Sequence, residues 1–202
     1  MLNLIKCGIG NIGSIRNALN SIGCSPNIVE HPSQINYDFK KIILPGVGSF
    51  DSFIIGLKKN GLFDEIKKLV LKNKYKILGI CVGMQSFFTD SEEGIEKGLN
   101  IIEGNLVKLN NSNNYKVPHM GWNNIEILNS ESLLNNLPES KFYFAHSYIV
   151  KNINNDKILS LTRHSEKFPS SIKYQNIYGV QFHPEKSFNQ GQKILKNFID
   201  LC

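Results

Sequence analysis

The stretch Gly79-Ile80-Cys81-Val82-Gly83-Met84-Gln85 decides the fold. It follows the apolar run Lys76–Ile80 directly, and an apolar segment continues beyond it. A cysteine framed by glycines at the end of a buried strand is typical of a nucleophile elbow, a strained turn that leads from a strand into a helix. In such a turn the start of the helix favours a thiolate at Cys81, and the backbone N–H of Val82 points toward an oxyanion. A lone cysteine is as well explained by a buried, unreactive thiol, so the interpretation requires partners elsewhere in the chain.

Outward from the elbow, short apolar runs alternate with amphipathic helical stretches. Strands are expected at 2–5, 27–29, 41–44 and 76–80, and helices at about 14–21, through 53–57 and through 63–71. This alternation predicts a parallel sheet with helices on both faces. Further strands at 106–109, 142–144 and 177–182 and a closing helix at about 192–200 complete the pattern. We therefore expect one domain, residues 1–202, with a three-layer, flavodoxin-like α/β fold and added antiparallel strands.

A second motif, Gly179-Val180-Gln181-Phe182-His183-Pro184-Glu185-Lys186, supplies partners for the cysteine. If a strand ends at His183 and the chain stays extended, His183 and Glu185 face the same way. The carboxylate would then orient the imidazole, which would serve as the base for Cys81. Alone, His183 is better explained as a core or capping histidine. Together with the elbow it predicts a triad for covalent acyl transfer.

A third motif, Leu44-Pro45-Gly46-Val47-Gly48-Ser49-Phe50, follows a predicted strand at the sheet edge where α/β proteins bind ligands. Its glycines allow the backbone to approach a substrate and to present an N–H, although a plain turn before a helix has the same pattern. A competing motif is Gly8-Ile9-Gly10-Asn11-Ile12-Gly13, which fits the dinucleotide fingerprint, with Glu30 near the expected distance. An NAD-binding protein would leave the elbow and the His183–Glu185 pair without a role.

Composition limits the function further. The net charge of +6 arises from 23 Lys plus Arg against 17 Asp plus Glu, and the lysines are scattered, which argues against nucleic-acid binding. The cysteines and histidines show no metal-ligand spacing, so no metal and no cofactor are expected. The sequence shows no signal peptide and no apolar run long enough for a bilayer, and a cytoplasmic protein is expected.

These motifs resemble the signatures of class I glutamine amidotransferases over nearly the whole chain. Within that family the chain is similar to the glutaminase subunits of imidazole glycerol phosphate synthase. The segments that carry this similarity are Pro45–Gly48, Ser91–Gly94, the run Val117-Pro118-His119-Met120-Gly121-Trp122-Asn123, Ala145–Tyr148 and His183–Ser187.

The resemblance implies a role for each matched residue. Cys81 is the nucleophile, His183 the base and Glu185 its orienter. The oxyanion hole is implied at Val47, Gly48 and Val82, and the residues implied in glutamine binding are Gly48, Gln85, Glu93, His146, Ser147 and Tyr148. Asn11, Met120, Trp122 and Lys186 are implied at an interface with a (β/α)8-barrel synthase subunit that receives the ammonia. In the Pro45–Gly48 turn, a peptide rotation at Gly46 and Gly48 is expected to switch the site on when the partner binds.

Two alternatives remain open. Paralogues of these subunits supply ammonia for amidino groups of bacterial surface sugars, and the stretches Gly10–Ser14 and Lys196–Ile199 resemble them. A catalytically inactive binding subunit is the other alternative, which the intact triad disfavours.

Overall fold

The computed structural model describes residues 1–8, 11–111, 115–138 and 141–202. A sheet of eight strands runs through the centre in the order β2-β1-β3-β4-β12-β11-β10-β7. The strands are β1 (Asn3–Ile5), β2 (Asn27–Val29), β3 (Lys41–Gly46), β4 (Lys76–Cys81), β7 (Glu126–Ile127), β10 (Ile158–Arg163), β11 (Lys167–Tyr174) and β12 (Ile177–Val180). The first five strands in that order are parallel, and β11, β10 and β7 continue the sheet in antiparallel fashion.

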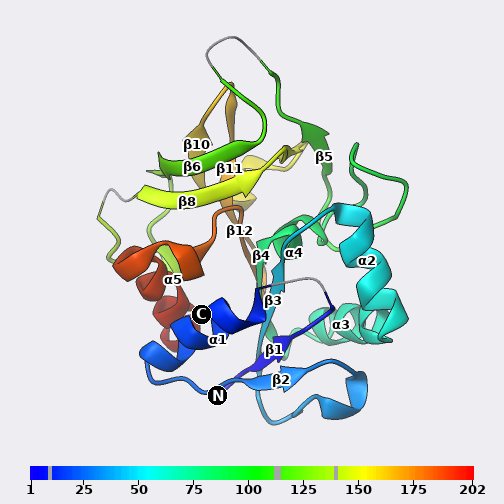
Figure 1. Cartoon of the computed structure of the whole chain (residues 1–202). Coiled ribbons are helices and arrows are strands. Elements are labelled where there is room, and N and C mark those ends of the chain that lie inside the picture. The colour runs from blue at the N-terminus through cyan, green and yellow to red at the C-terminus, as the bar shows by residue number, and fades with distance from the viewer. Residues whose placement is uncertain (9–10, 112–114, 139–140) are drawn as a thin grey trace.

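Helices cover both faces of the parallel part. The helices α1 (Ile12–Ser21) and α5 (Phe188–Asp200) pack together on one face, and α2 (Phe50–Lys59) and α3 (Leu62–Leu71) lie on the other (Figure 1). Each turns an apolar stripe toward the sheet, as Phe53, Ile54 and Leu57 do in α2. This is the predicted three-layer arrangement, and the fold class is confirmed.

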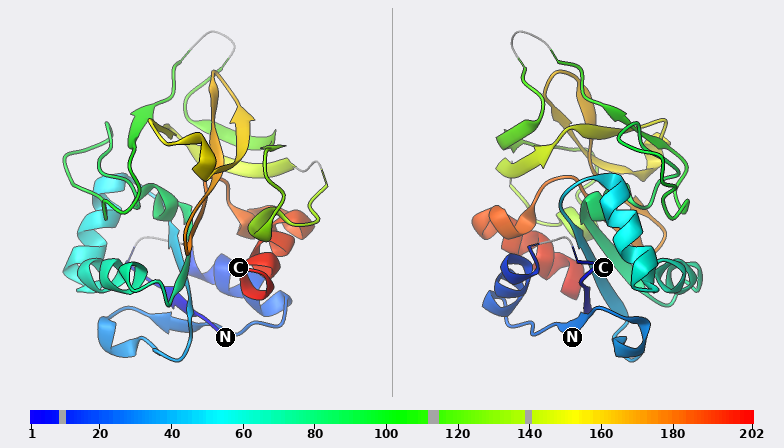
Figure 2. Two further views of the ribbon diagram at one scale, coloured as in Figure 1. Left: turned by 180° about the vertical axis from the view of Figure 1, so that it is seen from behind. Right: turned by 45° about the vertical axis from the view of Figure 1, so that its right-hand side comes forward.

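Two smaller ladders sit beyond the carboxyl edge of the parallel strands (Figure 2). One pairs β5 (Asn105–Lys108) with β9 (Tyr148–Lys151), and the other pairs β6 (His119–Asn124) with β8 (Lys141–His146). Short 3₁₀ turns complete the chain: η1 (Pro32–Gln34), η2 (Ser132–Leu134), η3 (Asn155–Lys157) and η4 (Pro184–Lys186). Among the described residues, no helix has the length and apolar character needed to cross a membrane.

Two sequence-based bounds were wrong. The strand expected to end at His183 ends at Val180, and the helix expected from about 192 begins at Phe188. The helix after the elbow, α4, is a single turn, Val82–Gln85. The remaining strands, β6, β7, β9, β10 and β11, were not predicted. For β10 and β11 the reason is that they carry polar residues inside. Ser160, Ser170 and Ser171 are fully buried, and the Ser160 hydroxyl lies 2.8 and 2.6 Å from the other two.

Candidate active site

Three neighbouring parallel strands end at the same edge of the sheet. Gly46 at the end of β3 pairs with Cys81 at the end of β4, and β12 flanks β4 on the other side, where Val180 pairs with Ile80. The segments that leave these strands therefore meet: the Val47–Gly48 turn, the elbow and the loop that carries His183. An open α/β sheet places its ligand site at this edge.

The elbow is held by backbone strain and by close packing. Cys81 has φ 54° and ψ −113°, a conformation that non-glycine residues rarely adopt. A Cβ at Gly83 would lie 1.8 Å from the Leu44 carbonyl oxygen, and one at Gly79 would lie 2.6 Å from the Met84 nitrogen. These glycines let α4 press against β3 and β4. Because α4 is only one turn long, its dipole is a smaller influence on Cys81 than the sequence suggested.

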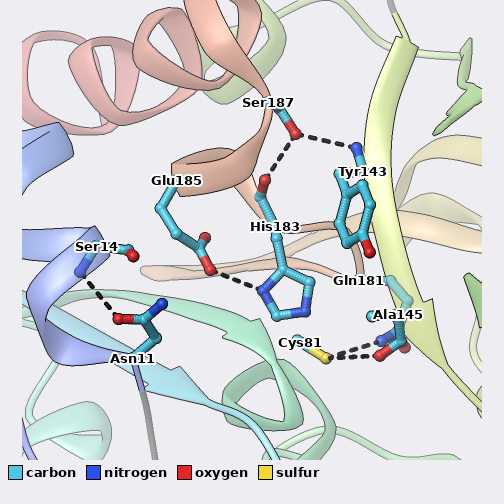
Figure 3. Close-up of polar contacts among 9 residues, drawn as sticks. All are labelled: Asn11, Ser14, Cys81, Tyr143, Ala145, Gln181, His183, Glu185 and Ser187. Atoms are coloured by element: carbon cyan, nitrogen blue, oxygen red, sulfur yellow. Dashed lines mark hydrogen bonds and ion pairs between the residues drawn. The ribbon is translucent and has the colours of Figure 1, made fainter. Parts of the chain in front are cut away.

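His183 and Glu185 form a buried pair. The imidazole Nδ1 lies 2.8 Å from Glu185 Oε1, and each side chain is only 2% exposed (Figure 3). The pairing was predicted, but its reason was wrong: Glu185 lies in the 3₁₀ turn η4, so the turn and not an extended chain brings the carboxylate back. Burial by itself lowers the pKa of His183, but the Cys81 sulfur and the Glu185 carboxylate outweigh it and raise the pKa to about 10.

Ser187 and Tyr143 fix the position of His183. The His183 N–H donates to the Tyr143 carbonyl at 2.8 Å. The Ser187 hydroxyl donates to the His183 carbonyl at 2.6 Å and accepts from the Tyr143 N–H at 3.0 Å (Figure 3). The imidazole is thereby tied to β8. The roles of Ser187 and Tyr143 could not be predicted from the sequence, because these contacts join segments that are distant in the chain.

The Cys81 sulfur has two further polar neighbours. It lies 3.9 Å from the Ala145 carbonyl oxygen, and the side-chain nitrogen of Gln181 lies 3.7 Å from it. The second ring nitrogen of His183 faces the sulfur from the other side (Figure 3). Gln181 belongs to the second sequence motif, but only the folded chain places it beside Cys81.

A cavity of about 250 Å³ opens above the sulfur. Cys81, His183, Ala145 and Lys186 line this cavity. The lining also contains every residue that the resemblance implied for the oxyanion hole and for glutamine binding: Val47, Gly48, Val82, Gln85, Glu93, His146, Ser147 and Tyr148. The structure thus brings these residues together, and their roles toward a substrate remain predictions.

Two of these residues also have internal partners. Glu93 Oε2 accepts from the Phe50 N–H at 2.7 Å, which places a carboxylate at the start of α2. The side-chain nitrogen of Gln85 donates to the Tyr148 carbonyl at 3.1 Å and to Gln181 Oε1 at 3.0 Å. Burial, followed by the charges of Glu93 and Glu92, raises the pKa of Tyr148, in keeping with an acidic end of the cavity.

The residues implied at an interface lie on the surface. Met120 is 65% exposed and Trp122 46% exposed on the outer face of β6, and Trp122 stacks on Phe188, which is 75% exposed. The Lys186 ammonium lies over the Tyr143 ring, and the Tyr143 ring packs edge-on against Trp122. Asn11 is exposed and caps α1 by accepting from the Ser14 N–H.

Glu30 of the competing fingerprint and three of the histidines are engaged in contacts within the chain. Glu30 is paired with Lys6 at 2.8 Å, while Ile9 and Gly10 of the glycine motif lie outside the described residues. His119, His146 and His164 lie together, although they are far apart in sequence. Their ring nitrogens are used in hydrogen bonds, and no group of metal-binding side chains occurs in the described part of the chain.

Known proteins resemble the whole chain. The family model for glutamine amidotransferase class-I matches residues 3–201. The "Imidazole glycerol phosphate synthase subunit HisH 2" of Methanococcus maripaludis is 46% identical over 200 residues, 98% of both chains. The "Imidazole glycerol phosphate synthase subunit HisH 1" of Campylobacter jejuni is 41% identical over 203 residues, the full length of both.

Solved structures agree in fold. A crystal structure described as a glutamine amidotransferase superposes with a TM-score of 0.77 at 16% identity, covering 98% of this chain and 97% of that one. PurLQS from Thermotoga maritima gives a TM-score of 0.75 at 18% identity, with the same coverage. The chain therefore belongs to the class-I glutamine amidotransferase family, in its branch of imidazole glycerol phosphate synthase HisH subunits.

Proposed function

We propose that this chain is the glutaminase subunit of an imidazole glycerol phosphate synthase, with Cys81, His183 and Glu185 as its catalytic residues. The observation that carries the proposal is the cavity at the ends of β3, β4 and β12, into which the strained elbow presents the Cys81 sulfur opposite the His183–Glu185 pair. The names of the full-length relatives favour this assignment over the amidino-sugar alternative.

The geometry supports a thiolate–imidazolium pair in the resting site. With its pKa raised to about 10, His183 is protonated at neutral pH, and its charge stabilises a thiolate on Cys81. The thiolate attacks the amide carbon of glutamine. As the C–N bond breaks, His183 gives its proton to the departing nitrogen, and ammonia leaves behind a glutamyl thioester. Water, deprotonated by the now neutral His183, then attacks the thioester, and the expelled Cys81 thiolate and the protonated His183 restore the thiolate–imidazolium pair as glutamate leaves.

The two ends of the cavity contact different parts of the substrate. The N–H groups of Val82 and of the Val47–Gly48 turn serve the oxyanion near the sulfur, where one lost donor costs about 100- to 1000-fold in rate. Glu93 accepts from the substrate ammonium at the acidic end beside Tyr148. Gln85 acts through its position, because its nitrogen already donates to Tyr148 and Gln181.

The ammonia goes to a (β/α)8-barrel synthase subunit bound at what we name the aromatic face, formed by Met120, Trp122, Tyr143, Lys186 and Phe188. Aromatic side chains with adjacent cations are typical binding hot spots, and Lys186 also lines the cavity. Phe188 joins the residues implied by the sequence because it stacks on Trp122 at 5.3 Å between ring centroids.

The peptide rotation that would switch the site on involves fewer residues of the Pro45–Gly48 turn than the sequence suggested. Gly46 lies within β3, where it pairs with Cys81 and packs so closely that an added Cβ would lie 2.7 Å from the Gly83 nitrogen. Gly48 lies beyond the strand at φ 94°, a conformation that favours glycine, so we place the partner-driven rotation at the Val47–Gly48 peptide. The isolated chain is expected to release glutamate slowly and the assembled enzyme quickly.

Rescue of a histidine auxotroph that lacks its own HisH subunit tests the proposal. The wild-type gene, expressed with its barrel partner, should restore growth without histidine, and Cys81→Ser should not. Failure of the wild-type pair, with both chains expressed and glutamine hydrolysis intact in extracts, would move the chain to the amidino-sugar alternative.

A further inference from the structure

The Cys81 sulfur lies at one end of a buried hydrogen-bond chain. Gln181, which is fully buried, points its side-chain nitrogen at the sulfur (Figure 3). Its side-chain oxygen accepts from Gln85. Gln85 in turn donates to the Tyr148 carbonyl. The two Gln85 contacts hold that side chain in the proposed glutamine site, whereas the contact between Gln181 and the Cys81 sulfur has no role in the proposed chemical steps.

The chain has one possible direction. A backbone carbonyl only accepts, so the group that Gln85 presents to Tyr148 is its NH₂. The same NH₂ also donates to Gln181, so the Gln181 atom that accepts this hydrogen bond must be the side-chain oxygen. The remaining end of the Gln181 amide, the one that meets sulfur, is then necessarily a donor. The Tyr148 carbonyl oxygen thus determines, through Gln85, that Gln181 presents a hydrogen-bond donor to the Cys81 sulfur.

A second series of hydrogen bonds, through His146 and His119, ends at the same Tyr148 carbonyl. His146 Nδ1 lies 2.9 Å from the Tyr148 oxygen and must carry a hydrogen. Its neutral Nε2 accepts from His119 Nδ1 at 3.0 Å, and His119 Nε2 accepts from the Asn123 side-chain nitrogen at 3.1 Å. Burial, followed by the charge of the other histidines, lowers the pKa of His146 to about 3 and that of His119 to about 4, so both rings are neutral as this chain requires.

The sulfur therefore has a donor and an acceptor beside it. The thiol form donates its hydrogen to the Ala145 carbonyl, and the thiolate form receives a charge-assisted hydrogen bond from Gln181. We propose that Gln181 is a positioning residue for the nucleophile, which holds the Cys81 sulfur toward the cavity and stabilises its thiolate, with Gln85 and the Tyr148 carbonyl fixing the orientation of the amide. The proposal rests on Cys81 being the nucleophile.

Alkylation of Cys81 by iodoacetamide, followed by mass spectrometry of its peptide over a range of pH, tests this without glutamine or partner. Other titratable groups around the same cavity are His183, His146, Glu93, Tyr148 and Lys186, and all remain in the variants. In Gln181→Met the side chain keeps its length and loses its donor. We expect the pH of half-maximal alkylation to rise by about one unit, a roughly tenfold loss of thiolate below the midpoint.

Gln181→Glu is the second variant. It keeps the acceptor for Gln85 and turns a carboxyl oxygen toward the sulfur, so the midpoint should also rise. Asn197→Leu is the control, because this buried amide donates only to Leu133 and Asn135 carbonyls and its loss should affect stability alone. Wild-type pH dependence in a folded Gln181 variant overturns the inference and leaves the proposed function intact. If wild-type Cys81 itself reacts no faster than free cysteine at neutral pH, the nucleophile assignment fails with it.

Discussion

His183 is the residue whose chemistry depends most on its surroundings. Its side chain is almost fully buried, yet the pKa is raised, because the Cys81 sulfur and the Glu185 carboxylate both favour the charged ring. In the proposed mechanism the same imidazole releases a proton to the leaving amide nitrogen and later accepts one from water. We therefore propose that Glu185 orients the ring and, together with the Cys81 sulfur, sets the pH range over which His183 works.

Removing His183 should be about as damaging as removing Cys81, whereas Glu185→Gln should be milder. The amide keeps some orientation but loses the negative charge, so the pKa of His183 falls and the alkaline limb of kcat/KM moves to lower pH. Losses in His183→Ala and Cys81→Ser should not add, because the two act as a unit. Steady-state glutamate release from the assembled enzyme, followed from about neutral pH to beyond the raised pKa of about 10, checks this. An unchanged alkaline limb in Glu185→Gln would contradict the assigned role of the carboxylate.

At the scale of elements, the elbow depends on β3, β4 and α4 lying unusually close. The glycines that permit this contact are needed for space rather than for positive φ, since Gly79 and Gly83 have no room for a Cβ. The strained residue is Cys81 itself. The packing of three elements therefore holds the nucleophile in a conformation that it would not adopt alone.

Gly83→Ala should lower the free energy of unfolding by about 3 kcal/mol or more, because its Cβ would lie 1.8 Å from the Leu44 oxygen. Gly13→Ala is a matched control in α1, where the nearest atom is 3.8 Å away. There, alanine should stabilise by about 0.5 kcal/mol or more, because it restricts the unfolded chain. Urea denaturation of both variants measures the difference. Equal stabilities would mean that the elbow is not closely packed.

Some helices and strands could be predicted from the sequence and others could not. The strands β1 to β4 and the helices α1 to α3 have clean apolar periods, and the three motifs that meet at the site each follow a strand. The ladder of β6 and β8 carries the contacts that sequence spacing missed, from Tyr143 to His183 and from Ala145 to Cys81. Such contacts join segments that are distant in the chain. The local pattern of a strand indicates which face it buries, but it does not say which residue of a distant strand lies opposite.

The whole molecule carries two sets of histidines with opposite responses to pH. His119 and His146 are buried and neutral, so the unfolded chain binds more protons than the folded one between about pH 6.5 and pH 4. Stability should therefore fall as the pH drops through that range. His183, with its raised pKa, contributes stability below pH 6.5 that is lost as the pH rises toward 10.

Acidification from about pH 7.5 to about pH 5 should remove about 2 kcal/mol of folding free energy for each of the two buried imidazoles. His146→Gln keeps a donor for the Tyr148 carbonyl and removes one titrating ring. The folding free energy that this variant loses on the same acidification should therefore be smaller than the wild-type loss by about 2 kcal/mol. His31→Gln, at an exposed histidine that caps η1, is the control. Urea titrations at the two pH values decide. A wild-type-sized loss in His146→Gln would contradict the proposed neutral histidine pair.

The assembled enzyme offers the most direct test of the central claim, that Cys81 releases ammonia from glutamine for a second subunit. Synthase activity of the complex is measured with glutamine or with ammonium chloride as the nitrogen source, for wild type and for Cys81→Ser. We predict that Cys81→Ser loses glutamine-dependent synthesis by at least about 1000-fold and keeps ammonium-dependent synthesis at the wild-type rate. Glutamine-dependent synthesis at the wild-type rate in Cys81→Ser would contradict the account.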